Sequence, residues 1–282
     1  MTQTCIAALL EDARIRLTAI SDTPRLDAEV LLAYSLNKPR SHLRAWPERV
    51  ADIEQAHQFA ELLTRRLQGR PVAHLIGRRE FWSLDLQVTP ATLIPRPETE
   101  LLVELALARL PADQPVQVAD LGTGSGAIAL AIARERPRAE VVATDFSIEA
   151  LQVAEQNARR LGITNVEFRR GDWCAALGDD RFALIVSNPP YLADTDIHLS
   201  QGDVRFEPRC ALVAGKDGLD AIRLIIAQAG EHLNTGGWLL LEHGFDQRKA
   251  VAALLQDHGF TAIKNYRDLA GLDRVSGGCR PL

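Results

Sequence analysis

Near the start of the chain, apolar residues recur three and four positions apart, with polar residues between them. The pattern covers residues 3–20, 24–36 and 52–69. This spacing gathers apolar side chains on one face of a helix. Pro24 suits a first helical turn, and Gly69 suits a helix end. The sequence therefore predicts a small helical domain over residues 1–75.

The pattern changes to alternation of apolar and polar residues over residues 79–89, which are rich in aromatic and β-prone types. Alternation of this kind is typical of strands, and we expect a β-hairpin here. Pro90, Pro95 and Pro97 then stiffen a loop that runs into the next helix. Residues 76–97 are therefore expected to form a hairpin and linker between two domains.

From Pro115 onward, short apolar runs alternate with helical stretches. This order is typical of an α/β fold with a doubly wound, mostly parallel sheet. We expect strands at residues 116–122, 140–145, 166–172, 182–188 and 237–244, with later ones at 260–266 and 274–279. We expect the intervening helices near residues 127–134, 148–161, 219–233 and 247–257. Residues 98–282 thus form the predicted second domain.

Composition narrows the function classes only slightly. The 282 residues have a formal net charge of −5, from 32 basic and 37 acidic side chains, so a basic footprint for nucleic acid over the whole molecule is absent. The four cysteines form no C-x-x-C pair, and no histidines have a metal-ligand spacing, which disfavours structural disulfides and a metal site. No apolar run reaches the roughly 18 residues of a membrane span. We expect a soluble, cytoplasmic protein.

A glycine-rich stretch, DLGTGSG, follows the first strand of the second domain and opens a helix. Its glycines permit a tight turn and close approach of a ligand to the backbone. The interpretation as a cofactor loop rests on Gly122, Thr123, Gly124, Ser125 and Gly126. A dinucleotide-binding loop and a plain strand-to-helix turn stay open, because the spacing of these glycines also fits both.

Acidic and aromatic residues end the next two strands. Asp145 is placed to accept hydrogen bonds from ribose hydroxyls, and the alternative is a cap for the helix that begins near Ser147. Asp172 is placed to accept from an adenine amino group, and Trp173 to cover the ring face. The alternative is a tryptophan that packs under a loop. Together these residues indicate an adenosine pocket.

The segment NPPY, from Asn188 to Tyr191, follows the fourth strand. Two consecutive prolines lack N–H groups and restrict the residues before them, so the segment forms a stiff loop. Ligands of open α/β sheets bind beyond the carboxyl ends of the strands. We therefore expect Asn188 to face the same crevice as Gly122 and Asp145, although a simple proline-rich turn is the alternative.

The residue types in this loop fit one kind of chemistry. The nitrogen of an amide or an exocyclic amino group is a poor nucleophile, because its lone pair is delocalised. An enzyme that alkylates it must hold the NH2 group. The side-chain carbonyl of Asn188 and the backbone carbonyl of Pro189 are able to accept both N–H bonds, and Tyr191 is placed to pack on the flat group. The loop, including Pro190, is therefore predicted to clamp a planar NH2 group for methyl transfer.

The set DLGTGSG, Asp145, DW and NPPY resembles the class I S-adenosylmethionine-dependent methyltransferases. The stretches REFWSLDLQVTPATLIPRPETE, QGDVRFEP and LLLEHG also resemble the HemK/PrmC family, the glutamine methyltransferases of peptide chain release factors. The likeness covers nearly the full chain. It implies a Rossmann-like catalytic domain, S-adenosylmethionine as cofactor, and N5 methylation of the glutamine in the Gly-Gly-Gln tip of release factors.

The resemblance also implies roles for individual stretches. Gly122–Gly126, Asp145, Asp172 and Trp173 would contact the cofactor, and Asn188 both cofactor and substrate. Asn188 to Tyr191, with both prolines, would hold the substrate amide. The loop at residues 94–100 would close over the reacting centre, residues 204–208 would shape the substrate side, and the helical domain would help to grip the release factor.

Three other functions stay open at this point. An adenine or cytosine DNA methyltransferase shares an NPPY clamp and flips its base into such a pocket, although the acidic net charge argues against DNA. A dehydrogenase fits the glycine loop and Asp145 but leaves NPPY unexplained. A non-catalytic cofactor-binding module would not need Asn188 and Tyr191, which are both present.

Overall fold

The computed structural model describes residues 4–281, which form two compact units. The first unit extends to Arg78 and also contains Ile197–Phe206. The second unit contains Arg79–Asp196 and the chain from Glu207 onward. Residues 1–3 and 282, which the expected domain ranges include, lie outside the described residues.

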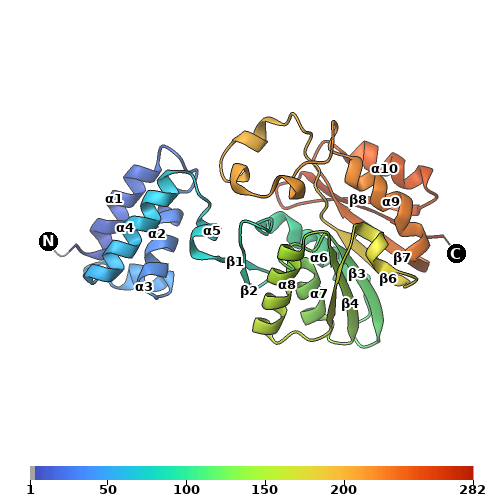
Figure 1. Ribbon diagram of the computed structural model, residues 1–282, viewed down its shortest axis with the longest axis horizontal. Coiled ribbons are helices and arrows are strands. Elements are labelled where there is room, and N and C mark those ends of the chain that lie inside the picture. Colours follow the sequence, from blue (N-terminus) through green and yellow to red (C-terminus); the bar gives the residue numbers. More distant parts are fainter. Residues whose placement is uncertain (1–3, 282) are drawn as a thin grey trace. The chain divides into compact units, whose positions relative to one another are not determined.

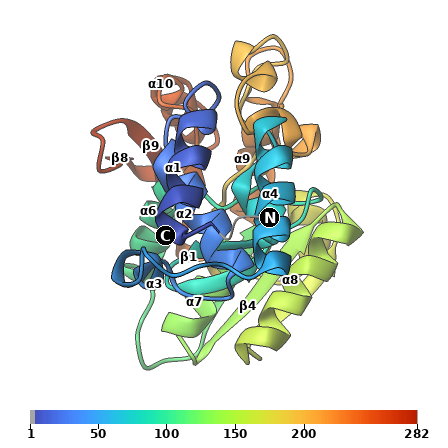
Figure 2. The same ribbon diagram turned by 90° about the vertical axis from the view of Figure 1, so that its left-hand side faces the viewer.

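The first unit is a helical bundle whose main helices lie side by side in both ribbon views (Figures 1 and 2). Its helices are α1 (Ile6–Leu17), α2 (Pro24–Ser35), α3 (Arg40–Ala45), α4 (Ile53–Leu67) and α5 (Val72–Ile76). Asp52 caps α4 by accepting from the Gln55 backbone N–H at 2.8 Å, in a capping box. The sequence pattern predicts α1, α2 and α4. It misses α3 and α5, which are too short to show a period.

A segment distant in sequence joins this helical unit. Ile197–Phe206, with the short 3-10 helices η3 (Ile197–Ser200) and η4 (Val204–Phe206), belongs to the first compact unit. Asp203 pairs with Arg66 of α4, which explains the attachment. The domain ranges expected from sequence placed this segment in the second domain, because a pairing over such a separation leaves no local pattern.

The second unit is built on a seven-stranded sheet with the order β5-β4-β3-β6-β7-β9-β8. The five strands from β5 to β7 run parallel, and β9 runs antiparallel to both of its neighbours. The bounds are β3 (Val116–Leu121), β4 (Ala139–Asp145), β5 (Val166–Arg170), β6 (Phe182–Ser187), β7 (Leu233–Glu242), β8 (Thr261–Arg267) and β9 (Asp273–Cys279). The predicted mostly parallel, doubly wound sheet is confirmed.

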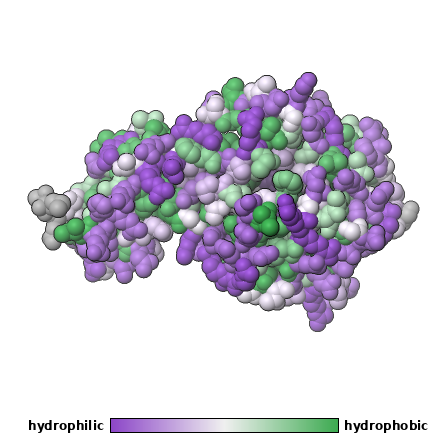
Figure 3. Space-filling model, viewed as in Figure 1, coloured by the Kyte–Doolittle hydropathy of each residue, from purple (hydrophilic) through white to green (hydrophobic). Residues whose placement is uncertain are grey.

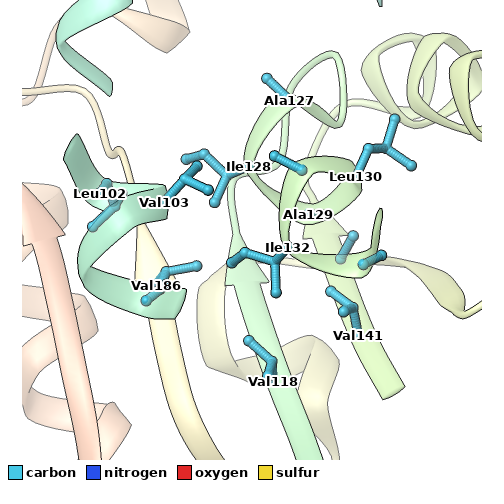
Figure 4. Close-up of a cluster of buried hydrophobic side chains, with 14 of the residues drawn as sticks. Leu102, Val103, Val118, Ala127, Ile128, Ala129, Leu130, Ile132, Val141 and Val186 are labelled. Carbon is cyan, nitrogen blue, oxygen red and sulfur yellow. The ribbon is translucent and has the colours of Figure 1, made fainter. Parts of the chain in front are cut away.

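Helices cover both faces of this sheet (Figure 1). On one face lie α6 (Glu100–Leu107), α7 (Ala127–Glu135) and α8 (Ile148–Leu161), and on the other lie α9 (Asp220–His232) and α10 (Arg248–Asp257). Figure 4 shows Ile128 and Ile132 of α7 among Val118, Val186 and the α6 side chains. Buried apolar strands packed on both faces fit the uninterrupted apolar runs of the sequence.

The expected hairpin is present as β1 (Arg78–Phe81) and β2 (Leu84–Gln87), which form a two-stranded sheet. Its side chains Phe81, Leu84 and Leu86 are buried in the same core as α6 and α7. The hairpin therefore packs as part of the second unit.

Polar side chains dominate the face drawn in Figure 3. None of the helices within residues 4–281 has the length and apolar character that crossing a bilayer requires.

Candidate active site

The carboxyl ends of β3 and β6 lie side by side at the point where the strand order reverses. Leu121 pairs with Ser187, and the Ser187 hydroxyl donates to the Leu121 carbonyl at 2.7 Å. Gly122 and Asn188, the next residues, therefore leave the sheet at the same level. Such a reversal opens a crevice in doubly wound sheets. The glycine loop and the NPPY loop are brought together here as the sequence predicts.

A cavity of about 1000 Å³, open to solvent, lies at these strand ends within the second unit. The cavity is lined by nine predicted residues: Gly122, Thr123, Gly124, Ser125, Asp145, Asp172, Trp173, Asn188 and Pro190. The other three, Gly126, Pro189 and Tyr191, do not line it.

The glycine loop is shaped by its neighbours. Gly122 has φ of +71°, and a Cβ there would meet the Trp173 ring at 3.1 Å. Gly126 is the residue just before α7 and lies against Leu130 and Ala154, where a Cβ would approach both to about 3 Å. Gly126 therefore serves the packing of the helix rather than the cavity wall. Gly122 instead presents bare backbone to the cavity.

Asp120, the first residue of the DLGTGSG stretch, is completely buried behind the loop. Its Oδ2 accepts from the Thr123 hydroxyl at 2.7 Å and from the Ala129 N–H at 3.1 Å. Burial raises the Asp120 pKa to about 7, while these two hydrogen bonds oppose the rise. The carboxyl thus ties the loop to the first turn of α7. Its position at a strand end was visible in the sequence, but its role was not.

Asp145 accepts two backbone hydrogen bonds. Its Oδ2 accepts from the Gly124 N–H at 2.8 Å, and its Oδ1 accepts from the Ser147 N–H at 2.9 Å. Burial raises its pKa, and both bonds oppose that shift. The cap of α8 is Ser147, whose hydroxyl accepts from the Ala150 N–H at 3.1 Å. Asp145 therefore fixes the glycine loop and still lines the cavity with its remaining lone pairs.

Asp172 and Trp173 follow β5, as expected. Asp172 is exposed, and its side chain makes no capping bond to the 3-10 helix η2 (Trp173–Leu177). Trp173 has φ of +47°, a left-handed conformation that is uncommon for a bulky residue. Its ring lies against Gly122 and packs on the core beneath. The backbone strain at Trp173 coincides with a cavity wall, where strain often serves a function.

The NPPY loop is held at both ends. The Asn188 Nδ2 donates to the Thr99 hydroxyl at 3.1 Å. Pro189 is buried, and Pro190 lines the cavity. The Tyr191 ring packs on the buried cluster of the α9 face, and its hydroxyl lies 3.5 Å from the Glu242 Oε1. Tyr191 thus supports the loop from behind and does not line the cavity.

Several cavity residues were missed from sequence. Phe146 directly follows Asp145, lines the cavity and is 68% exposed. An exposed phenyl ring beside a ribose-type acid offers a flat apolar surface for a base. The sequence signal that would have identified Phe146 is its position as an aromatic residue directly after the acid at the end of the strand. Pro95, Arg96 and Thr99 bring the loop at residues 94–100 to the cavity, where the resemblance implies it.

Glu207 fastens that loop to the far side of the cavity. Its side chain is fully buried and accepts from the Ile94 N–H at 2.9 Å and from the Arg96 guanidinium. The next residue, Pro208, lines the cavity. These contacts join the two stretches that the resemblance assigns to the reacting centre and the substrate side. Sequence alone assigned no individual role within residues 204–208.

Asn157 of α8 connects the glycine loop to the hairpin. It is completely buried, and its Nδ2 donates to the Ser125 carbonyl at 2.9 Å and to the Gln87 carbonyl at 3.0 Å. Its Oδ1 accepts from the Gln87 N–H at 2.7 Å. One amide thus satisfies backbone groups of both elements. A polar residue on the inner face of α8 was the only sequence signal for this contact.

Two family models match this chain. The PrmC N-terminal domain matches residues 8–77, and the methyltransferase small domain matches residues 98–204.

Curated relatives match over nearly the whole length. The release factor glutamine methyltransferase of Pseudomonas aeruginosa is 54% identical over 98% of this chain and 98% of its own. The protein of the same name from Coxiella burnetii is 52% identical over 92% of this chain and 93% of its own.

Solved structures share the fold of the second unit. A ribosomal protein L11 methylase of Lactobacillus delbrueckii subsp. bulgaricus is 25% identical over 66% of this chain and 81% of its own, with a TM-score of 0.51. The 16S rRNA N2 G1207 methyltransferase of T. thermophilus is 21% identical over 72% of this chain and 49% of its own, with a TM-score of 0.55. The two curated relatives show that the chain belongs to the family of release factor glutamine methyltransferases.

Proposed function

We propose that this protein transfers a methyl group from S-adenosylmethionine to the side-chain amide nitrogen of the glutamine in the Gly-Gly-Gln motif of peptide chain release factors. The observation that carries the proposal is the shared cavity, in which Asn188 of the NPPY loop faces the glycine loop and Asp145. The names of relatives about half identical to this chain support the same substrate class.

The cavity residues fit the proposed cofactor. The bare backbone of Gly122 leaves room that a Cβ would fill, and the loop leads into the N-terminus of α7. Gly122 to Ser125 would hold the methionine portion, Asp145 the ribose, and Asp172, Trp173 and Phe146 the adenine. When bound, S-adenosylmethionine supplies an electrophilic methyl group. The residues of the chain orient the acceptor against it and keep water from the reacting atoms.

Asn188 and Pro189 would hold the acceptor. An amide NH2 presents two N–H donors, and the Asn188 Oδ1 and the Pro189 carbonyl offer two acceptors on consecutive residues. Because the prolines stiffen this backbone, little ordering remains to be done when substrate arrives. Proximity and orientation then supply most of the acceleration. A strong general base is not needed, since the nitrogen becomes acidic once it carries the methyl group.

The role of Tyr191 changes with the structure. Its ring is packed below the loop and its hydroxyl is directed at Glu242, so we assign it the support of the clamp. Packing of Tyr191 on the substrate amide stays a prediction from sequence. The helical unit supplies contacts to the release factor in this proposal, and the cytoplasmic location stays a prediction as well.

A DNA methyltransferase is the less favoured alternative. The clamp itself does not discriminate, because adenine also presents a flat NH2 group. The net charge of −5 opposes approach to the phosphate backbone, and the curated relatives carry names for a protein substrate. The interpretation as a dehydrogenase gives the NPPY loop no role.

Mass spectrometry of a release factor incubated with this protein and labelled S-adenosylmethionine tests the proposal. We expect one added methyl group on the glutamine of the Gly-Gly-Gln tip, and none when that glutamine is changed to glutamate. A filter assay on genomic DNA, run beside it, should retain no label. Labelled DNA with an unmodified release factor would overturn the assignment.

A further inference from the structure

The NPPY loop has few backbone donors with which to hold itself in place. Pro189 and Pro190 have no N–H group, so hydrogen bonds reach the backbone there only through carbonyl oxygens. The proposed function reserves the Pro189 carbonyl for the acceptor amide. The sheet fixes the start of the loop, because Ser187 pairs with Leu241. The other end, at Tyr191, lies beyond the strand and needs a support of its own.

Gln247 provides this support. It is the half-buried residue just before α10. Its Nε2 donates to the Tyr191 carbonyl at 2.9 Å, and its Oε1 accepts from the Gly244 N–H at 2.8 Å. Longer contacts of 3.3 Å and 3.4 Å join the same Nε2 to the carbonyls of Asp217 and Gly218. One side-chain amide therefore connects the NPPY loop to two other segments of the second unit.

The orientation of this amide follows from its partners. A half-turn of a side-chain amide exchanges its oxygen and its nitrogen, so an amide with ambiguous partners has two possible arrangements. Here a backbone carbonyl only accepts and a backbone N–H only donates. Nε2 must therefore face Tyr191, and Oε1 must face Gly244. An ionised glutamate at this position would place a carboxylate oxygen against the Tyr191 carbonyl.

The Tyr191 carbonyl is also approached closely by a glycine. Gly218 has φ of +74°, and a Cβ there would meet the Tyr191 carbonyl oxygen at 2.2 Å. The absence of a side chain lets this backbone lie against the carbonyl that Gln247 holds. The next residue, Leu192, donates its N–H to the Leu212 carbonyl at 2.9 Å. The chain therefore leaves the NPPY loop along a path fixed by hydrogen bonds.

We propose that Gln247 is a positioning residue, which fixes the Tyr191 carbonyl and thereby the Pro189 carbonyl of the clamp. Only Pro190 lies between them, and its ring fixes φ, so a shift at Tyr191 is transmitted to Pro189. This inference rests on the proposed function of the cavity. Gln247 does not line the cavity, and it touches no reacting atom in this account. Its loss should therefore slow methyl transfer and leave the cofactor site intact.

Kinetics of Gln247 variants test this dependence. Gln247→Leu removes every amide contact, whereas Gln247→Glu at pH 8 keeps the acceptor for Gly244 and removes the donor to Tyr191. We expect kcat to fall about tenfold in both, on the order of one lost hydrogen bond, with the KM for S-adenosylmethionine nearly unchanged. In an Asn188→Ala background, where the clamp is already incomplete, Gln247→Leu should change kcat by less than about threefold. An equal loss in both backgrounds would overturn the proposal.

The matched control is Gln228→Leu on α9. Gln228 is also half-buried, and its Oε1 is buried without a hydrogen-bond partner among the described residues. Gln228→Leu therefore replaces an amide of the same size at a similar burial, and kcat should be unchanged. An equal loss in this control would mean that the effect is not specific to Gln247, which would overturn the proposal.

A spectroscopic measurement separates this inference from the proposed function. The dipeptide Tyr-Leu occurs once in the chain, at Tyr191 and Leu192. Labelling tyrosine with 13C at the carbonyl and leucine with 15N therefore gives one correlated NMR signal, whose carbonyl shift reports the hydrogen bonds at Tyr191. Both Gln247 variants should move this signal without substrate present, and Gln228→Leu should not. An unchanged signal in both Gln247 variants would overturn the positioning role. If wild-type protein failed to methylate a release factor, the proposed function alone would fail.

Discussion

Arg66 and Asp203 form an ion pair across a sequence separation of 137 positions, with 2.8 Å between Nη1 and Oδ1. The Arg66 side chain is 6% exposed, and its Nε also donates to Asp27 at 2.8 Å. Asp203 belongs to the segment Ile197–Phe206, which follows the NPPY loop and leads directly into Glu207. The segment that connects the NPPY loop to Glu207 along the chain is therefore held in the helical unit by this ion pair.

Asp203→Ala should loosen this segment. The Asp203 side chain is 39% exposed, so solvent screening limits the loss of stability to about 1 kcal/mol. Arg66 also keeps Asp27 as a partner. Amide hydrogen exchange within residues 197–206 should accelerate about fivefold, while the sheet strands stay protected. Asp12→Ala, which removes an exposed ion pair with Arg16 on α1, is the control and should leave that segment unchanged. Unaltered exchange in Asp203→Ala would contradict the anchoring role.

Gly122→Ala should impair cofactor binding. The backbone φ of +71° is unfavourable for alanine, and the new Cβ would press on the Trp173 ring at 3.1 Å. We expect S-adenosylmethionine affinity, measured by calorimetry, to fall at least about tenfold, on top of a stability loss of about 1 kcal/mol.

Gly162→Ala is the matched control for that substitution. Gly162 ends α8 with φ of +69°, and a Cβ there meets nothing within 4 Å. Gly162→Ala should lower the stability by a similar amount and leave the affinity for S-adenosylmethionine unchanged. Equal losses of affinity in the two variants would mean that the Gly122 effect is general strain rather than a blocked cavity.

Asn188→Ala should separate binding from chemistry. The side chain is the proposed acceptor for the substrate amide, whereas the glycine loop and Asp145 remain intact. Turnover should fall on the order of a hundredfold or more, the scale of removing one positioned polar group at a reacting centre. Calorimetric titration with S-adenosylmethionine should stay close to wild type. Near wild-type turnover would exclude the clamp mechanism.

The sequence predicts most of the second unit because its signals are local. Apolar runs, turn glycines and strand-end acids place Gly122, Asp145 and Asn188 at one edge of a parallel sheet, and the sheet register brings them together. Helix α8 matches its expected range, because its apolar period and Ser147 cap are contained in the same stretch.

The remaining contacts join residues that no local pattern relates. Thr99 and Asn188 are 89 positions apart, and Arg96 and Glu207 are 111 apart. Threonine and glutamate are common surface residues. Only the folded chain reveals that Thr99 and Glu207 are buried and that each contacts a residue distant in sequence. For the same reason, the sequence does not reveal that Tyr191 packs on the core with its hydroxyl toward Glu242.

The buried carboxyl of Glu242 should make stability depend on pH. Burial raises its pKa from 4.5 to about 7, against the opposing effects of Thr99, Arg274 and Tyr191 and with a contribution from Glu98. Between these two values the folded protein binds the proton more tightly than the unfolded chain. The stabilising contribution is therefore complete below pH 4.5 and is lost as the pH rises through about 7.

Glu242→Gln removes this titration, so its stability relative to wild type should rise with pH. A shift from 4.5 to about 7 corresponds to a relative gain of about 2 kcal/mol between pH 5 and pH 8 in urea unfolding. The buried amide carries a cost of its own, but that cost is the same at both pH values. Asp120, whose pKa is also raised to about 7, is present in both proteins and cancels in the difference. The Glu242→Gln variant should therefore be more stable relative to wild type at pH 8 than at pH 5. A stability difference that does not change with pH would mean that Glu242 is already ionised in the folded protein at pH 5.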